Sequence, residues 1–82
     1  MPTVFRENGY RFFFYSNEGI PIEPCHIHVR QGSSVAKFWI EPMVSLDHSY
    51  GFSPAKLRKL AKTIIDNKEL IERKWNEYFD LK

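Results

Sequence analysis

Residues 25–30 read Cys25-His26-Ile27-His28-Val29-Arg30, and their regular alternation of apolar and polar side chains predicts a half-buried β-strand. Two more runs have the composition of strands: the aromatic run at residues 10–15, and residues 35–41, which Pro42 ends. Turn-forming residues separate the runs at residues 7–9, 16–19 and 32–34. The sequence therefore predicts an antiparallel β-meander of three to five strands within residues 1–46, with residues 43–46 as a short additional strand.

The second half of the chain changes to a helical pattern at Ser53-Pro54, where an N-cap hydroxyl precedes a proline at the first helical position. Asp66-Asn67 should interrupt or kink the helix, since Asn favours caps over helix interiors. Apolar residues follow helical spacing in two stripes: Leu57, Leu60, Ala61, Ile64 and Ile65, then Ile71, Trp75, Tyr78 and Phe79. We expect two helical segments within residues 53–80 that cover one face of the sheet, which makes residues 1–82 a single α+β domain. A partner-binding groove is the alternative interpretation of the two stripes.

The chain has 82 residues, a net charge of +2 and an isoelectric point of about 8.8. This mild positive charge permits contact with RNA or DNA without requiring it. The single cysteine, Cys25, cannot form an internal disulfide, and no apolar run approaches the length that spans a membrane. The first residues do not resemble a secretion signal. We therefore expect a cytoplasmic protein without membrane association.

Alternation along the strands assigns their side chains to two faces of the sheet. The apolar set should pack against the helices: Tyr10, Phe12, Phe14, Cys25, Ile27, Val29, Ala36, Phe38 and Ile40. The other set defines what we call the polar face: Arg11, Phe13, Tyr15, His26, His28, Arg30, Lys37, Trp39 and Glu41. Keeping His28 on the same face as Lys37 requires a two- or four-residue hairpin loop around residues 32–35.

The polar face combines positive charge, imidazole and flat rings. This mixture suits RNA, since rings stack on bases while Arg and Lys bind phosphate. It also suits a protein interface, where Arg, Trp and Tyr contribute much of the binding energy. A solvated face whose aromatic rings shield the sheet is the interpretation without a function. The predicted binding residues are Phe13, Tyr15, Lys37, Trp39 and Glu41.

His26 and His28 are the candidate catalytic residues, because residues i and i+2 of a strand project from the same face. Imidazole titrates near neutral pH, so the pair can serve as base and acid when an RNA 2′-hydroxyl attacks phosphorus. Arg11, Arg30 or Lys37 would then stabilise the developing negative charge. A ribonuclease of this kind would be independent of metals and would need no cofactor.

Two other interpretations of the histidines stay open. They could bind a metal, for which Glu41 and His48 are the plausible additional ligands. They could also be structural residues that only form hydrogen bonds. Cys25 is not expected to act with His26, because neighbouring residues of a strand point to opposite faces.

Several motifs occur together along almost the whole chain: Met1-Pro2-Thr3, residues 9–18, residues 24–29, residues 36–39 and residues 75–79. In this combination the chain resembles the bacterial domain of unknown function family 4160, whose Tyr-Arg-Phe-Phe-Phe-Tyr and Pro-x-His-Ile-His-Val motifs match residues 10–15 and 24–29. Members of that family commonly have Pro at the position of Cys25, which implies no role for the thiol.

The resemblance also implies a genetic context. Members of the family are often encoded beside a small protein of another uncharacterised family, and such pairs look like type II toxin–antitoxin modules. We therefore expect the toxin-like component of such a module, acting on RNA or translation and neutralised by a small antitoxin-like partner encoded nearby. A non-enzymatic module that docks a protein on the polar face is the second interpretation.

Overall fold

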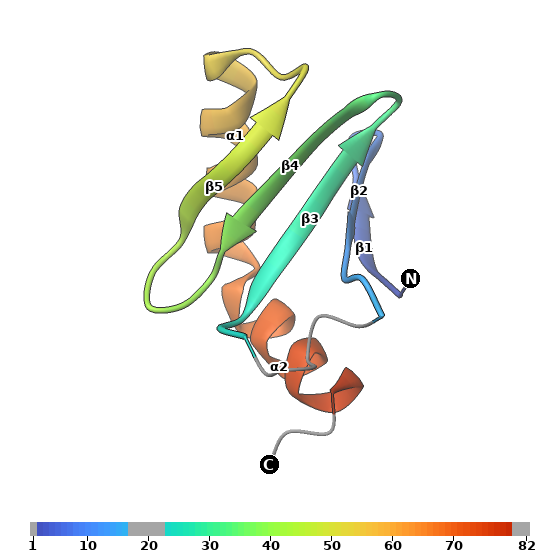
Figure 1. The fold of residues 1–82 in the computed structure, drawn as a ribbon, viewed down its shortest axis with the longest axis vertical. Helices are drawn as coiled ribbons and strands as arrows, with labels where there is room; N and C mark the ends of the chain where they lie inside the picture. The colour runs from blue at the N-terminus through green and yellow to red at the C-terminus, as the bar shows by residue number, and fades with distance from the viewer. Residues whose placement is uncertain (1, 17–22, 80–82) are drawn as a thin grey trace.

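Five antiparallel strands follow one another across a single sheet in chain order, and two helices come after them, in the computed structural model (Figure 1). The structure describes residues 2–16 and 23–79. The elements are β1 (Thr3–Glu7), β2 (Tyr10–Phe13), β3 (His26–Gln31), β4 (Ser34–Trp39), β5 (Ser45–Tyr50), α1 (Pro54–Asp66) and α2 (Lys68–Tyr78). The predicted α+β meander is confirmed. Most of the turn expected at residues 16–19, and the helix end expected at residue 80, lie outside the described residues.

The register of the central hairpin places side chains on the predicted faces. A two-residue loop, Gly32-Ser33, joins β3 to β4, so that His28 pairs with Lys37 and Ile27 with Phe38. Ile27 and Phe38 are both buried. The predicted hairpin loop and the separation of the two faces are therefore confirmed.

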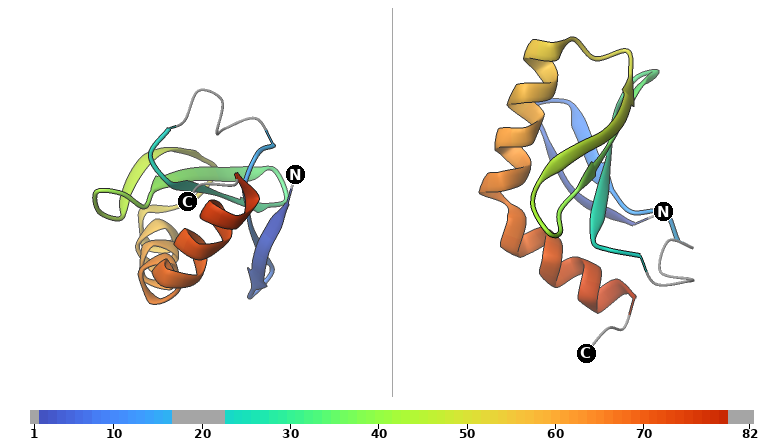
Figure 2. Two further views of the ribbon diagram at one scale, coloured as in Figure 1. Left: turned by 90° about the horizontal axis from the view of Figure 1, so that it is seen from below. Right: turned by 60° about the vertical axis from the view of Figure 1, so that its left-hand side comes forward.

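Both helices cover the same face of the sheet, and the opposite face turns toward the viewer in Figure 1 (Figures 1 and 2). The core between the layers contains residues from both helices and from β2, β3 and β4 or the positions next to them: Phe12, Phe14, Cys25, Ile27, Val29, Ala36, Phe38, Ile40, Leu60, Ile64, Ile71 and Trp75. Ile65, expected in the first stripe, is instead 57% exposed. It lies about 100° round the helix from Ile64, which carries it past the margin of the buried side. Within the described residues, neither helix is long and apolar enough to cross a membrane.

A bend at Asn67 separates the two helices, as the sequence predicts. The Asn67 side chain donates a hydrogen bond from Nδ2 to the carbonyl oxygen of Thr63 over 2.8 Å, which satisfies one carbonyl at the end of α1. Beyond the bend, α2 turns under the lower end of the sheet (Figure 2, right). Trp75 is thereby packed against Phe14, with ring centroids 5.2 Å apart.

Strand β5 extends the meander to Tyr50, beyond the predicted limit at residue 46. A bulge opposite β4 explains why its pattern is not strand-like in the sequence: Lys37 pairs with His48 and Phe38 with Leu46, which leaves Asp47 as the extra residue. Polar residues also occupy most of this edge strand. The bulge and this composition together remove the alternation of apolar and polar side chains by which a strand is recognised in a sequence.

Candidate nucleic-acid interface

A row of three arginines crosses β1, β2 and β3 on the polar face. Arg6 pairs with Arg11, and Arg11 pairs with Arg30. Directly opposed residues of neighbouring strands lie about 5 Å apart at their Cβ atoms, where like charges repel. The Arg11 Nε donates a hydrogen bond to the Thr3 hydroxyl over 2.7 Å, so its guanidinium leans from the row toward Thr3 and Phe13, which pair with each other. A bound anion would relieve the repulsion along this row.

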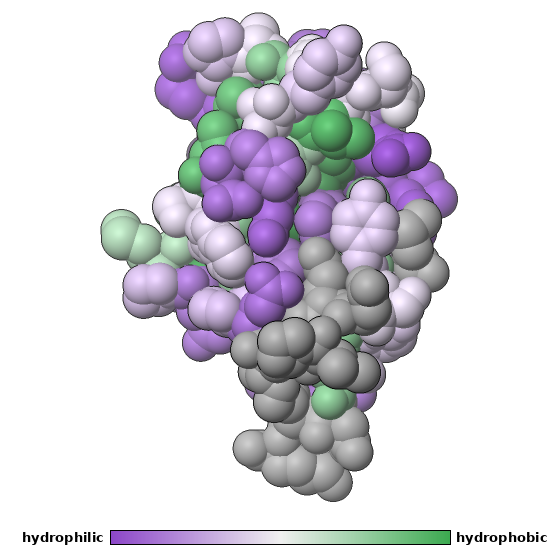
Figure 3. Space-filling view, in the orientation of Figure 1, coloured by the Kyte–Doolittle hydropathy of each residue, from purple (hydrophilic) through white to green (hydrophobic). Residues whose placement is uncertain are grey.

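A second row lies two residues further along the strands, roughly 7 Å from the arginines. Here His28 pairs with Lys37 of β4, and Lys37 pairs with His48 of β5. The backbone position of Lys37 therefore lies between those of two histidines on one face. Hydrophilic side chains gather over the middle of this face (Figure 3).

Aromatic rings adjoin both rows. The Lys37 Nζ lies 4.3 Å from the centroid of the Trp39 ring, and the Arg11 guanidinium carbon lies 4.4 Å from that of Phe13. The Tyr15 ring meets the ring of His28 edge-on at 4.4 Å. These contacts hold the cations over aromatic faces, an arrangement that favours them electrostatically.

Two of the predicted site residues are buried. Phe13 is 1% exposed and His26 is 0% exposed. The His26 ring lies 5.2 Å from that of Trp39 and 5.0 Å from that of Trp75 in α2, and its Nδ1 is 3.0 Å from the Pro24 carbonyl oxygen. His26 and His28 do lie together, with ring centroids 5.4 Å apart, but only His28 is partly exposed.

The remaining predicted residues are spread over the same side. Arg30 is exposed on β3, whereas Lys37 and Trp39 are half-buried on β4. Glu41 is exposed in the bend that follows β4, so it lies beyond the end of the strand. Tyr15 likewise follows the end of β2 at Phe13.

The bulge in β5 builds a network that the sequence did not predict. The Asp47 carboxylate accepts a hydrogen bond from Trp39 Nε1 at 3.1 Å and one from His48 Nδ1 at 2.7 Å. Lys37 Nζ lies 4.0 Å from the same carboxylate. The hydrogen bond from His48 is the main cause that lowers the pKa of Asp47 below its usual value of 3.8, and the bond from Trp39 and the Lys37 charge act in the same direction.

Sequence reasoning overlooked Arg6 and Asp47 as members of this surface, and it named His48 only as a possible metal ligand. A signal existed for Arg6, because an Asn8-Gly9 turn fixes the pairing of Arg6 with Arg11. For Asp47 there was none, since the position of a bulge cannot be read from alternation.

Cys25 is buried in the core of the protein. Burial is the main cause that raises the pKa of the Cys25 thiol to about 12, with the charge of Glu41 next, so this side chain is not a thiolate near neutral pH. Among residues 2–16 and 23–79, no three His, Cys, Asp or Glu side chains are grouped closely enough to hold a metal ion. Glu41 and His48 thus do not complete a set of ligands around His26 and His28.

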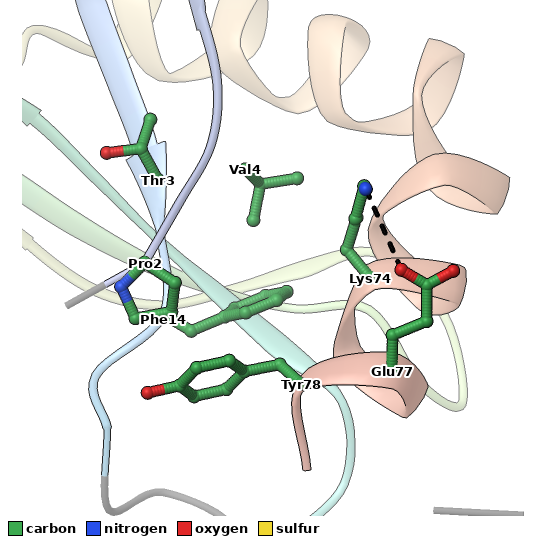
Figure 4. A pocket seen from close by; sticks show the side chains of 7 residues that line it. All are labelled: Pro2, Thr3, Val4, Phe14, Lys74, Glu77 and Tyr78. Atoms are coloured by element: carbon green, nitrogen blue, oxygen red, sulfur yellow. Dashed lines mark ion pairs between the residues drawn. The ribbon is translucent and has the colours of Figure 1, made fainter. Parts of the chain in front are cut away.

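A separate pocket of about 230 Å³ lies between β1 and α2 (Figure 4). Its lining is mainly apolar, and the ion pair between Lys74 Nζ and Glu77 Oε1, 3.6 Å long, borders it. The residues around it are Pro2, Thr3, Val4, Phe14, Lys74, Glu77 and Tyr78. Because the cation and the carboxylate neutralise each other, the pocket does not favour a charged ligand.

Comparison with known proteins places the chain in a family. No curated protein and no solved structure matches it. One family model, described as Domain of unknown function (DUF4160), matches residues 9–76, which include β2, β3, β4, β5 and α1 in full. On this evidence the chain belongs to the DUF4160 family.

Proposed function

We propose that this protein is the toxin-like component of a bacterial type II toxin–antitoxin module, and that it acts in the cytoplasm by binding RNA on its polar face. A small antitoxin-like protein encoded nearby would neutralise it. Membership of the family supports the genetic context through the resemblance described above, and the polar face supports the choice of RNA.

The observation that carries the proposal is the row formed by Arg6, Arg11 and Arg30. Placing like charges opposite one another on a sheet costs stability. A phosphate backbone laid along the row offsets the repulsion and can accept bidentate hydrogen bonds from guanidinium groups. The row therefore favours a polyanion as the partner of this face.

The aromatic side chains favour a single strand over a duplex. Trp39 is half-buried, and Tyr50 is 71% exposed at the position opposite Val35, on the same face. Unpaired bases can stack on such rings, while the bases of a duplex are already stacked on one another. We therefore expect single-stranded RNA to bind more tightly than duplex RNA of the same length.

Docking of a protein is the second candidate, and exposed apolar side chains near β5 favour it. Met43, Leu46 and Tyr50 are 67%, 44% and 71% exposed, respectively. β5 is also an edge strand of the sheet, to which a partner can add a strand of its own. This surface is suited to the antitoxin-like partner, whose binding would adjoin the polar face.

The proposal is tested by the affinity for a fluorescent single-stranded RNA whose 2′-hydroxyls are all methylated, measured by anisotropy at several salt concentrations. Changing Arg6 or Arg30 to Gln should weaken binding and lower the salt dependence by about one counterion each. Lys59→Gln is the matched control, because Lys59 is exposed on α1, on the other side of the sheet. Equal losses in all three variants would indicate non-specific attraction, and failure of the wild-type protein to bind would refute the proposal.

A further inference from the structure

The bulge in β5 puts two consecutive side chains, Asp47 and His48, on the polar face. In a regular strand they would point to opposite faces. Here His48 pairs with Lys37, whose side chain is on the polar face, and Asp47 contacts both Trp39 and Lys37 from the same side. The bulge therefore makes possible the 2.7 Å hydrogen bond between His48 Nδ1 and Asp47 Oδ2.

This hydrogen bond determines which nitrogen of His48 faces outward as a base. An ionised carboxylate can only accept hydrogen bonds, so Nδ1 carries a proton in the contact with Asp47. In the neutral imidazole, the lone pair is then on Nε2. The His48 side chain is 68% exposed, so Nε2 is accessible to a substrate.

Neighbouring groups supply the rest of an acid–base site. Lys37 lies directly between His48 and His28 in the register, and its ammonium leans over Trp39 beside Asp47, so a phosphate that binds this ammonium would lie within the part of the face that the two histidines flank. The Cα atoms of the two histidines are two strand spacings apart, roughly 10 Å. The His28 ring packs against Tyr15 in this structure, and it would turn toward Lys37 when a phosphate is bound. The row of arginines lies one step further along the strands and can hold an adjacent phosphate.

We propose that His48 is the general base of a metal-independent ribonuclease, that Lys37 binds the scissile phosphate and that His28 is the general acid. This inference rests on the proposed function, because it needs RNA on the polar face. Asp47 is a positioning residue that acts through His48. His26, the sequence-based candidate, is replaced in the role by a histidine from the edge strand.

The reaction is a transesterification without oxidation or reduction. His48 Nε2 takes the proton of a 2′-hydroxyl, and the 2′-oxygen forms a bond to phosphorus while the bond from phosphorus to the 5′-oxygen breaks. Protonated His28 gives its proton to the departing 5′-oxygen, and Lys37 stabilises the additional charge on the phosphoryl oxygens. The products are a 2′,3′-cyclic phosphate and a free 5′-hydroxyl. The two imidazoles recover their starting protonation states by exchange with water.

The test compares cleavage with binding for one single-stranded oligoribonucleotide and its fully 2′-O-methylated analogue, in buffer with a chelator that suppresses metal-dependent nucleases and with all variants purified in the same way. Wild-type protein should cut the first into cyclic-phosphate products and only bind the second. His48→Gln should slow cleavage by at least about 100-fold. Its affinity for the methylated analogue should stay within about twofold of wild type, because the substitution removes a base without adding charge.

Asp47→Asn separates positioning from structure, because it should slow cleavage without weakening binding. Loss of a carboxylate beside Lys37 should leave binding of the methylated RNA as tight as in wild type or tighter. Cleavage should slow by at least about tenfold, since the Asn amide no longer fixes the tautomer of His48. Lys59→Gln should cleave as the wild type does.

The failures of the two proposals are distinguishable. Binding without cleavage by the wild-type protein, or undiminished cleavage by His48→Gln, would overturn the catalytic inference and leave RNA binding standing. Absence of binding to either oligonucleotide would overturn both.

Discussion

The ring of His26 lies against the ring of Trp75, with centroids 5.0 Å apart, so a residue of β3 is joined to the second helix at the end of the sheet. Both side chains are almost completely buried. Since α2 turns under this end of the sheet, a side chain of the second helix covers a histidine of the polar set. His26 is therefore better placed to stabilise the fold than to exchange protons with a substrate.

Replacing His26 with Ala should lower the free energy of unfolding by about 2–4 kcal/mol, because the change leaves a cavity among Trp39, Trp75 and the strand. His28→Ala, at a partly exposed position on the same strand, should cost less than half as much. Urea denaturation followed by circular dichroism measures both. Equal losses would mean that His26 does not have the packing role described here.

The two tryptophans should differ in the same assay. Trp75 is 2% exposed and its ring contacts those of Phe14 and Phe79, so Trp75→Ala should cost about 3–5 kcal/mol. Such a loss is enough to unfold much of a domain this small. Trp39→Ala should cost clearly less, because this ring is half-buried on the polar face. A larger loss for Trp39 would contradict the assignment of the two faces.

Two glycines with positive φ provide a matched pair of variants. A Cβ at Gly51, where φ is +84°, would lie 3.1 Å from the Cβ and 3.2 Å from the Cα of Ser34. At Gly32, where φ is +60°, a Cβ would meet no atom within 4 Å. Each change to Ala should cost about 1–2 kcal/mol for the left-handed backbone. Gly51→Ala should show the greater loss of thermal stability, and the reverse order would refute the steric argument.

The indole N–H of Trp39 should report the charge of Asp47. The pKa of Asp47 in the folded protein is below its usual value of 3.8, mainly because His48 donates to the carboxylate. A lowered pKa means that the network contributes to stability above that usual value and loses its contribution as the pH falls through the lower, folded value. The Trp39 indole resonance in two-dimensional NMR should therefore shift as Asp47 is protonated, with a midpoint below pH 3.8. In Asp47→Asn this shift should be absent; its persistence would assign the titration to another group.

Induced expression of the protein alone should arrest bacterial growth, and expression of the small neighbouring gene should restore it. Arg30→Gln should relieve the arrest if contact with RNA causes it, because the substitution removes one member of the arginine row. Lys59→Gln should stay toxic. A wild-type protein that is harmless in its own host, when the neighbouring gene is deleted, would rule out the toxin function.

The alternation at residues 25–30 and 35–41 was sufficient to predict which side chains face the helices, because every second residue must point the same way. Ile27 and Phe38 are buried, and His28 lies beside Lys37, as this reasoning required. The interruption at Asn67 was also predictable, since it depends on a local preference. These features arise from interactions between residues that are close in sequence, or from a single short hairpin.

Features that depend on tertiary structure escaped prediction. The burial of His26 depends on the direction that α2 takes after Asn67, which no local pattern encodes. The approach of Asp47 to His48 depends on one additional residue in β5, opposite a regular strand. For these two reasons, the sequence identified the polar face correctly but did not identify which of its residues are accessible.

The bend at Asn67 also fixes the number of residues that can connect the two helices. The fully buried helix residues Leu60, Ile64, Ile71 and Trp75 fall within about 60° of arc when each residue advances about 100°, so the two helices keep a common phase across the bend. One residue inserted or deleted at the bend would rotate Ile71 and Trp75 by about 100° relative to Leu60 and Ile64. The junction therefore tolerates exchange of side chains more readily than a change in the number of residues.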